Sequence, residues 1–209
     1  LPLPKIMEKL ISLSLIKMVI MPMVQDILTK SDKQMSDIGA IAVANGPGSY
    51  TGLRIGVAAV KAMCFGLGIK CCGVSTLSAL AFSNMAFVGN ICSIMKARGE
   101  LVYTCSYKSD SFTVKPICEE KLISRDELSK FLALDQEGTL LCGDGAADFF
   151  NDYRSTLFTL APPQSRLQNA TGVCLAGASA SLIDSELLEV SYLQKVKAEK
   201  DLEYRSKTN

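Results

Sequence analysis

The chain has 209 residues, 48% of them hydrophobic, and carries 22 basic against 21 acidic side chains. This length is sufficient to bury a substantial core, and the net charge of +1 provides no strong field that would draw the chain to nucleic acid or to an anionic membrane. The sequence contains no histidine. That absence excludes Ser-His-Asp and Cys-His dyads and histidine zinc sites, and leaves carboxylates, lysine or a cofactor for any catalysis.

The eight cysteines are scattered through mostly apolar runs, and only Cys71 and Cys72 are adjacent. C-x-x-C spacing and the short, loop-rich character of secreted disulfide scaffolds are both missing, so we expect reduced, buried thiols and a cytoplasmic protein. The apolar stretch 1–23 is interrupted by prolines and charged residues. We therefore expect neither a membrane span nor a signal peptide there.

The first part of the chain predicts alternating helices and strands. A helix over 19–30 would place Met23, Val24, Ile27 and Leu28 on one side. The expected elements that follow are a buried strand at 38–44, a loop at 45–52, a helix from Leu53 to Leu67 that ends at Gly68, a strand at 70–75, and a helix at 76–86 capped by Ser75 or Thr76. This order predicts a mostly parallel α/β sheet.

The second part begins a new βα unit at 90–97. We then expect a hairpin over 98–117 with its turn near Ser109-Asp110, a capping box of Ser124 and Glu127 before a helix at 125–134, a strand, turn and helix over 139–153, a loop at Pro162-Pro163, and a helix at 170–184. The boundary between two lobes is placed near residue 90. The predicted domains are an N-terminal α/β lobe, 1–90, and a C-terminal α/β lobe, 91–209, with a polar tail from 191.

The loop at 45–52 is rich in glycine like a phosphate-binding loop, but it matches neither of the two common phosphate-loop patterns. A Walker A motif and a dinucleotide fingerprint both require glycine where this chain has Thr51. What remains is a helix N-terminus, which favours an anion without specifying one. We interpret the segment as a turn and helix cap, with Ser49 or Thr51 as the cap. Its residues are Gly46, Pro47, Gly48, Ser49 and Thr51.

The helix after this loop is apolar on nearly every side, which is typical of a helix buried on more than one face. Small residues form one row on a 3.6-residue wheel, and Arg54 and Lys61 share a polar edge. Such a row would let another helix approach closely, either from this chain or from a second protein. The predicted partner-binding residues are Gly52, Gly56, Ala59, Lys61 and Met63.

Two stretches, GPGSYTGLRIG at 46–56 and GVSTL at 73–77, resemble the signature of the TsaB family. Softer matches follow in KARGELVYT at 96–104, where Lys96 stands in place of the usual aspartate, in CGDGAADF at 142–149, and in SYLQKVKAEK at 191–200. The resemblance covers residues from about 19 to 200 and implies the two-lobed, actin-like and sugar-kinase-like α/β fold (ASKHA, ribonuclease H-like). Asp144 is expected to have a structural role in its Gly-Asp-Gly turn.

The start of the chain departs from the family pattern. The opening strand that ends in D-T-S/T and the T-H-S before a helix such as 19–30 are both missing. We therefore expect that segments near the start, including one between residues 18 and 19, are absent from this sequence.

The resemblance implies a non-catalytic scaffold or activating subunit in the synthesis of threonylcarbamoyladenosine in tRNA. It would pair through helices of its N-terminal lobe with a TsaD-like catalytic paralogue, and a TsaE-like ATPase would join the assembly. ATP and threonylcarbamoyl-adenylate would be used by the complex, tRNA would be contacted only through it, and this chain would bind no cofactor or metal. The alternatives are a small-molecule kinase or a peptidase of the same superfamily, or a homodimer that hides the same helix.

Overall fold

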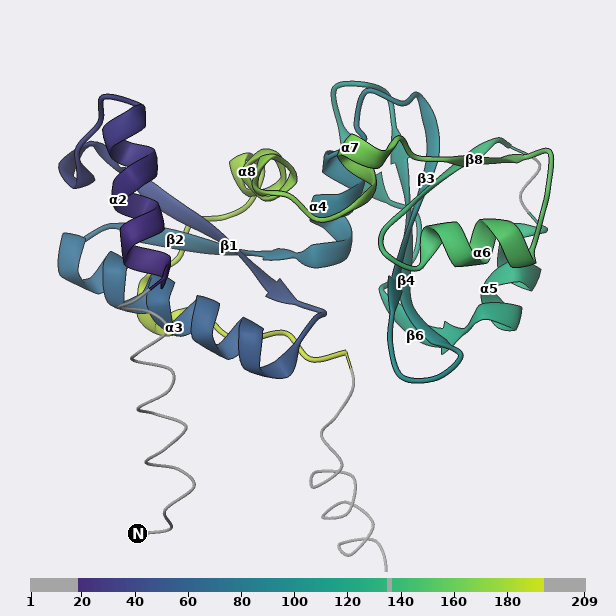
Figure 1. Ribbon diagram of the computed structural model, residues 1–209, viewed down its shortest axis with the longest axis horizontal. Coiled ribbons are helices and arrows are strands. Elements are labelled where there is room, and N and C mark those ends of the chain that lie inside the picture. Colours follow the sequence, from purple (N-terminus) through teal and green to yellow (C-terminus); the bar gives the residue numbers. More distant parts are fainter. Residues whose placement is uncertain (1–18, 135–136, 194–209) are drawn as a thin grey trace, which may run out of the picture. The chain divides into compact units, whose positions relative to one another are not determined.

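The computed structural model describes residues 19–134 and 137–193, which form two compact units (Figure 1). Of the described residues, unit 1 contains 19–74 together with Gly177–Val190, and unit 2 contains those of Ser75–Ala176 and 191–193. This division differs from the predicted boundary near residue 90, because the helix at 76–82 packs on strands of unit 2. The expected break between residues 18 and 19 and most of the polar tail lie outside the described residues.

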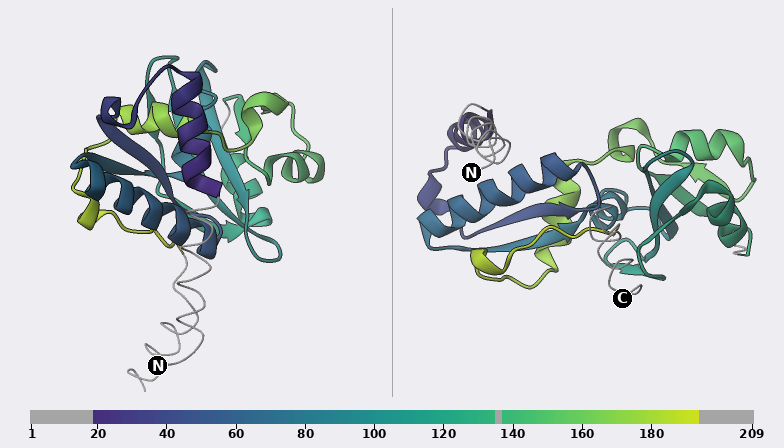
Figure 2. Two further views of the ribbon diagram at one scale, coloured as in Figure 1. Left: turned by 60° about the vertical axis from the view of Figure 1, so that its left-hand side comes forward. Right: turned by 90° about the horizontal axis from the view of Figure 1, so that it is seen from below.

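Unit 1 is built around one long helix and a strand pair. Strands β1 (Ala40–Gly46) and β2 (Lys70–Ser75) are neighbours, and helix α3 (Tyr50–Leu67) connects them and contacts β1 (Figure 2). The segment Gly177–Val190, with which the chain returns to unit 1, adds Leu188 to a core that also contains Val60 and Cys64. The other described elements of unit 1 are α2 (Met21–Lys30) and the short helices η2 (Met35–Asp37) and η3 (Ser185–Leu187).

Unit 2 contains a six-stranded sheet with the order β5-β4-β3-β7-β8, to which β6 is added by pairing with β4. Its strands are β3 (Gly89–Lys96), β4 (Leu101–Ser109), β5 (Val114–Pro116), β6 (Lys121–Ser124), β7 (Thr139–Cys142) and β8 (Phe158–Leu160). Its helices are α4 (Thr76–Phe82), α5 (Arg125–Leu132), α6 (Ala146–Asp152) and α7 (Pro163–Arg166), and α8 (Ala170–Ala178) leads back to unit 1.

The two faces of this sheet carry separate cores. On one face, Leu77 and Leu80 of α4 pack with Tyr107 of β4 and its neighbours. On the other, Leu128 of α5 and Phe149 of α6 pack with further strand residues. Side chains that alternate along each strand supply both clusters, as a sheet buried on two faces requires.

Most local predictions are confirmed. Ser75 caps α4, the Ser124–Glu127 capping box precedes α5, and β4 and β5 form the expected hairpin. The prediction of a βα unit that begins at 90–97 is wrong, because β3 is followed by the antiparallel strand β4 and not by a helix. In the described sheet of unit 2, the β3–β7 and β7–β8 pairs are parallel. None of the described helices has the length and apolar character needed to cross a membrane.

Candidate functional site

The loop between β1 and α3 is a capped helix start. Ser49 is the N-cap, and its Oγ accepts a hydrogen bond from the N–H of Gly52 at 3.3 Å. Gly46 has a φ of 141°, a conformation that favours glycine. Of the two predicted cap residues, Ser49 is the observed one, because α3 already begins at Tyr50 and Thr51 lies inside its first turn.

The other two loop residues have different environments. Pro47 is buried, whereas Gly48 is exposed and has no positive φ. A Cβ at Gly48 would meet Leu53 only at 3.7 Å, an ordinary contact distance. The backbone of this loop therefore requires glycine at residue 46 and not at residue 48.

The predicted row of small residues on α3 is not one exposed surface. Gly52 is exposed and Gly56 half-buried, but Ala59 is only 2% exposed and Met63 packs against the core of unit 1. The Lys61 ammonium donates hydrogen bonds to the carbonyl oxygens of residues 186 and 188, each at 3.0 Å. The middle of the row thus faces the inside of unit 1, which sequence periodicity could not decide for a helix that is apolar all round.

A neighbouring stripe of α3 faces outward instead. We call it the outer face of α3, and it consists of Tyr50, Arg54, Ala58, Ala62 and Phe65. Phe65 is 77% exposed, and at the other end the Arg54 guanidinium lies 3.9 Å from the centre of the Tyr50 ring. A large apolar side chain beside two small alanines is a surface that another helix can approach closely.

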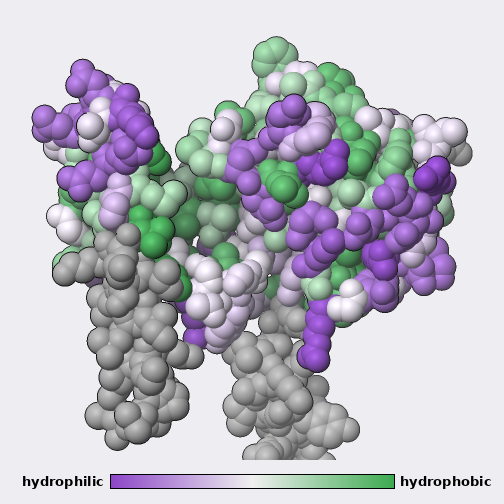
Figure 3. Space-filling view, viewed as in Figure 1, coloured by the Kyte–Doolittle hydropathy of each residue, from purple (hydrophilic) through white to green (hydrophobic). Residues whose placement is uncertain are grey.

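Helix α2 also exposes apolar side chains. Met23 is 58% and Ile27 60% exposed, and their spacing of four residues places them on the same side of the helix. No residue of α2 is buried. In Figure 3, hydrophobic residues (green) are visible on unit 1 below the hydrophilic residues (purple) at the C-terminal end of α2. Two helices of unit 1 therefore present apolar side chains without a cover in the chain as described.

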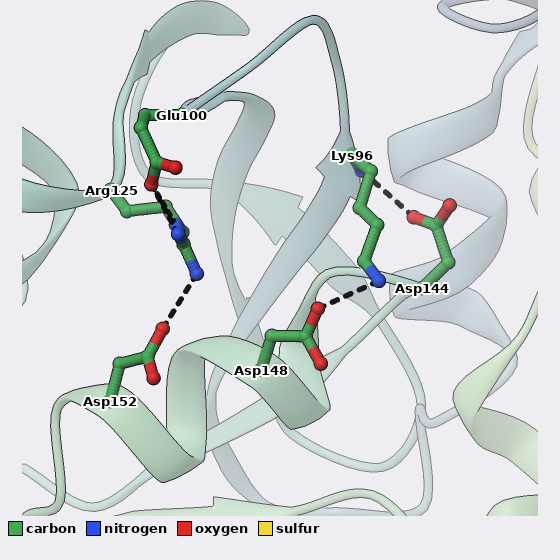
Figure 4. A network of polar contacts seen from close by, with 6 residues as sticks. All are labelled: Lys96, Glu100, Arg125, Asp144, Asp148 and Asp152. Atoms are coloured by element: carbon green, nitrogen blue, oxygen red, sulfur yellow. Dashed lines mark hydrogen bonds and ion pairs between the residues drawn. The ribbon is translucent and has the colours of Figure 1, made fainter.

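The Gly-Asp-Gly turn of unit 2 has the expected structural role. The Asp144 carboxylate accepts a hydrogen bond from the backbone N–H of Lys96 at 2.9 Å (Figure 4). The backbone N–H of Gly145 donates to the carbonyl of Ile94 at 3.0 Å, and a Cβ at Gly143 would lie 2.1 Å from that same oxygen. Glycine at residue 143 therefore lets the turn pass directly over the end of β3.

Charged groups around this turn are paired with one another. Lys96 forms an ion pair of 2.7 Å with Asp148, and a hydrogen bond with this lysine lowers the pKa of the Asp148 carboxyl. Arg125 bridges Glu100 and Asp152 beside them (Figure 4). The arrangement fastens β3, α5 and α6 together. Across residues 19–134 and 137–193, no cluster of three or more cysteine or carboxylate side chains is placed to hold a metal ion.

Comparison with protein families gives a match over most of the chain. Residues 17–182 match the model described as TsaD: tRNA N6-adenosine threonylcarbamoyltransferase. Among curated proteins, the chain is 43% identical over 88 residues to the tRNA threonylcarbamoyladenosine biosynthesis protein TsaB of Bacillus subtilis, which covers 42% of this chain and 38% of that protein. The TsaB protein of Escherichia coli is 40% identical over 93 residues, covering 44% of this chain and 40% of that protein. These two matches thus span about two fifths of each relative.

A longer match supports the same relationship, and two solved structures share the fold of this chain. The TsaB protein of Haemophilus influenzae is 27% identical over 186 residues, covering 84% of this chain and 72% of that protein. YeaZ from Pseudomonas aeruginosa has a TM-score of 0.71 at 21% identity, over 84% of this chain and 83% of that one. A second structure from the same organism, described as similar to peptidase YEAZ, gives 0.71 at 22% identity, over 83% and 82%. The predicted fold class, the actin-like and sugar-kinase-like α/β fold, is confirmed.

Proposed function

The chain belongs to the TsaD family, described as tRNA N6-adenosine threonylcarbamoyltransferase, as a TsaB-like member, and on this basis we propose that it takes part in the synthesis of threonylcarbamoyladenosine in tRNA. The names of the relatives from three bacteria support this assignment. The GPGSYTGLRIG segment that carries the resemblance forms the start of α3 and the capped loop before it.

Within that synthesis, the proposed role is that of a non-catalytic scaffold or activating subunit that pairs with a TsaD-like paralogue. The observation that carries this role is the outer face of α3, where Phe65 is 77% exposed next to Ala58 and Ala62. Exposed large apolar side chains beside small ones are typical of surfaces that another helix covers. Met23 and Ile27 of α2 would extend the same interface.

The resemblance to the TsaB family implies the other components of the proposed assembly. A TsaE-like ATPase joins the pair, and the complex uses ATP and threonylcarbamoyl-adenylate while this chain holds neither. The tRNA is contacted through the complex. The alternative functions, a small-molecule kinase or a peptidase of the same superfamily, stay predictions, and no observation favours them over the scaffold role.

The test is a binding experiment with the purified chain and a TsaD-like partner. Ala62→Arg places a charged, branched side chain at the centre of the outer face of α3 and should weaken binding at least tenfold, measured by titration calorimetry. Ala133→Arg is the matched control, because Ala133 is exposed at the end of α5 in unit 2. Circular dichroism should show both variants folded. Wild-type affinity in a folded Ala62→Arg variant would overturn the interface.

A homodimer would use the same surface, because one apolar face can serve either partner. Sedimentation velocity over a range of concentrations, with and without the paralogue, separates the two. We expect any self-association of the chain to be displaced by the paralogue. A dimer that persists in the presence of saturating paralogue would show that the two surfaces differ.

A further inference from the structure

Cys105 and Cys118 of unit 2 face each other across the edge of the sheet. In the β4–β5 ladder, Tyr107 is opposite Pro116. The pairing continues past β5, since the N–H of Ile117 donates to the carbonyl of Ser106 at 2.8 Å. The next pair in this register is Cys105 and Cys118.

The two thiols lie on the same side of the sheet and close to each other. Cys118 packs against the buried cluster that contains Cys105. The Cys105 thiol approaches the carbonyl oxygen of Cys118 at 3.2 Å, and the Cys118 sulfur accepts from the N–H of Ser106 at 3.3 Å. Hydrogen-bonded pairs alternate along an antiparallel ladder, so the cysteines occupy a non-hydrogen-bonded position, where Cα atoms are typically about 4.5 Å apart. Disulfides span about 4.4–6.8 Å between Cα atoms.

The surroundings give small molecules access to this pair. Both cysteines line an open cavity of about 600 Å³, together with Tyr107 and Glu120. The cavity forms where the register of β4 shifts: Thr104 pairs with Lys121, so that two residues between Cys118 and Lys121 have no partner in the ladder. Cys118 is half-buried, whereas Cys105 is 1% exposed.

We propose that Cys105 and Cys118 form a dithiol modification site, which a hydroperoxide converts into a disulfide between β4 and the segment after β5. This site is independent of the interface proposed for unit 1. The residues that carry it come from one unit and from segments only thirteen positions apart.

The chemistry is balanced by one peroxide. The Cys118 thiolate attacks a peroxide oxygen, an S–O bond forms while the O–O bond breaks, and the leaving oxygen takes a proton to become water or alcohol. The Cys105 sulfur then attacks the resulting sulfenic acid. An S–S bond forms, the S–O bond breaks, and the hydroxide leaves as water with the Cys105 proton. Two thiols are oxidised by two electrons in total, and the peroxide is reduced by two.

The order of these steps follows from burial. Burial is the main cause that raises the pKa of the Cys105 thiol to about 12, so this thiol stays protonated at neutral pH. Cys118 is the more exposed thiol and meets the oxidant first. Cys105 then acts as the resolving thiol.

The experiment uses the full chain, hydrogen peroxide as the oxidant, and iodoacetamide to block the thiols that remain. Trypsin leaves Cys105 in the peptide 99–108 and Cys118 in 109–121, because the bond between Lys115 and Pro116 resists cleavage. The expected product is these two peptides joined, lighter by two hydrogens than their sum, and separated again by dithiothreitol. Cys118→Ser should abolish the joined peptide, and in Cys105→Ser dimedone should label Cys118.

Cys64 and Cys71 provide the matched control within the same molecule. They are neighbouring thiols as well, but both are buried in the core of unit 1, 1% and 0% exposed. They should stay reduced under the same treatment. Recovery of Cys105 and Cys118 as separate peptides after peroxide has oxidised the exposed Cys174, in protein that remains folded, would overturn the proposal. So would equal oxidation of the Cys64–Cys71 pair, because access would then not be the deciding property.

Discussion

Ala59 and Ala62 lie three residues apart on α3 but face different surroundings. Ala59 is 2% exposed inside unit 1, and Ala62 is exposed on the outer face of α3. We predict that Ala59→Arg unfolds unit 1 or strongly destabilises it, while Ala62→Arg leaves it folded and affects only binding. The same substitution on the same helix therefore separates packing from recognition.

The magnitude follows from burial. At residue 59 a guanidinium would have to enter the apolar side of the helix without a counter-ion, or force α3 away from its core. Buried, unpaired charges belong to the group of substitutions that cost about 4–5 kcal/mol or more. A domain is typically stable by about 5–15 kcal/mol, so the loss is about a quarter of the total or more. At residue 62 the arginine reaches solvent, and a surface change of this kind stays within about 0.5 kcal/mol.

Urea unfolding followed by circular dichroism measures both effects. Ala59→Arg should lower the urea midpoint sharply or abolish the transition of unit 1, and Ala62→Arg should reproduce the wild-type curve. A cost below about 1 kcal/mol for Ala59→Arg would show that α3 does not bury this side, and the assignment of the outer face of α3 would be lost with it.

Three further predictions concern stability. Gly172→Ala should destabilise unit 2 by about 1–3 kcal/mol, because the new Cβ would lie 2.1 Å from the carbonyl oxygen of Ala79. Gly66→Ala on α3, where a new Cβ would meet nothing within 4 Å, should instead stabilise unit 1 by about 0.5–1 kcal/mol. The urea midpoints of the two variants distinguish these outcomes. Ser124→Ala removes the capping box of α5 and should cost about 1 kcal/mol in the same assay. Backbone N–H groups, first that of Thr113, lower the pKa of the Asp110 carboxyl in the folded state. The unfolded chain then binds more protons, so stability should fall as pH drops below the ordinary value of 3.8, and Asp110→Asn should flatten that dependence in acid-unfolding curves.

The local structure was predictable where a side chain itself makes the decisive hydrogen bond. Ser75 and Ser124 cap their helices as expected, and Gly68 ends α3 with a φ of 66°. The outward side of α3 was not predictable in the same way. When apolar residues surround a helix, periodicity defines rows but does not rank them, and only the position of β1 and of the returning segment 177–190 shows that Ala59 lies inside.

The pairing of Cys105 with Cys118 was also not predicted from the sequence. Eight scattered cysteines suggest separate buried thiols, and six of the eight are indeed buried. The hairpin turn near Asp110 was predicted, however, and a turn fixes register: each pair in the β4–β5 ladder is symmetric about residues 110–113, from Ser109 with Val114 to Tyr107 with Pro116. Continuing that symmetry by two positions places Cys105 opposite Cys118. The predicted turn near Ser109-Asp110 lies about two residues too early for this register, and a count from it would place Cys105 opposite Val114. The structure supplies the register that pairs Cys105 with Cys118, and it shows that both side chains pack in one cluster and that a cavity reaches them.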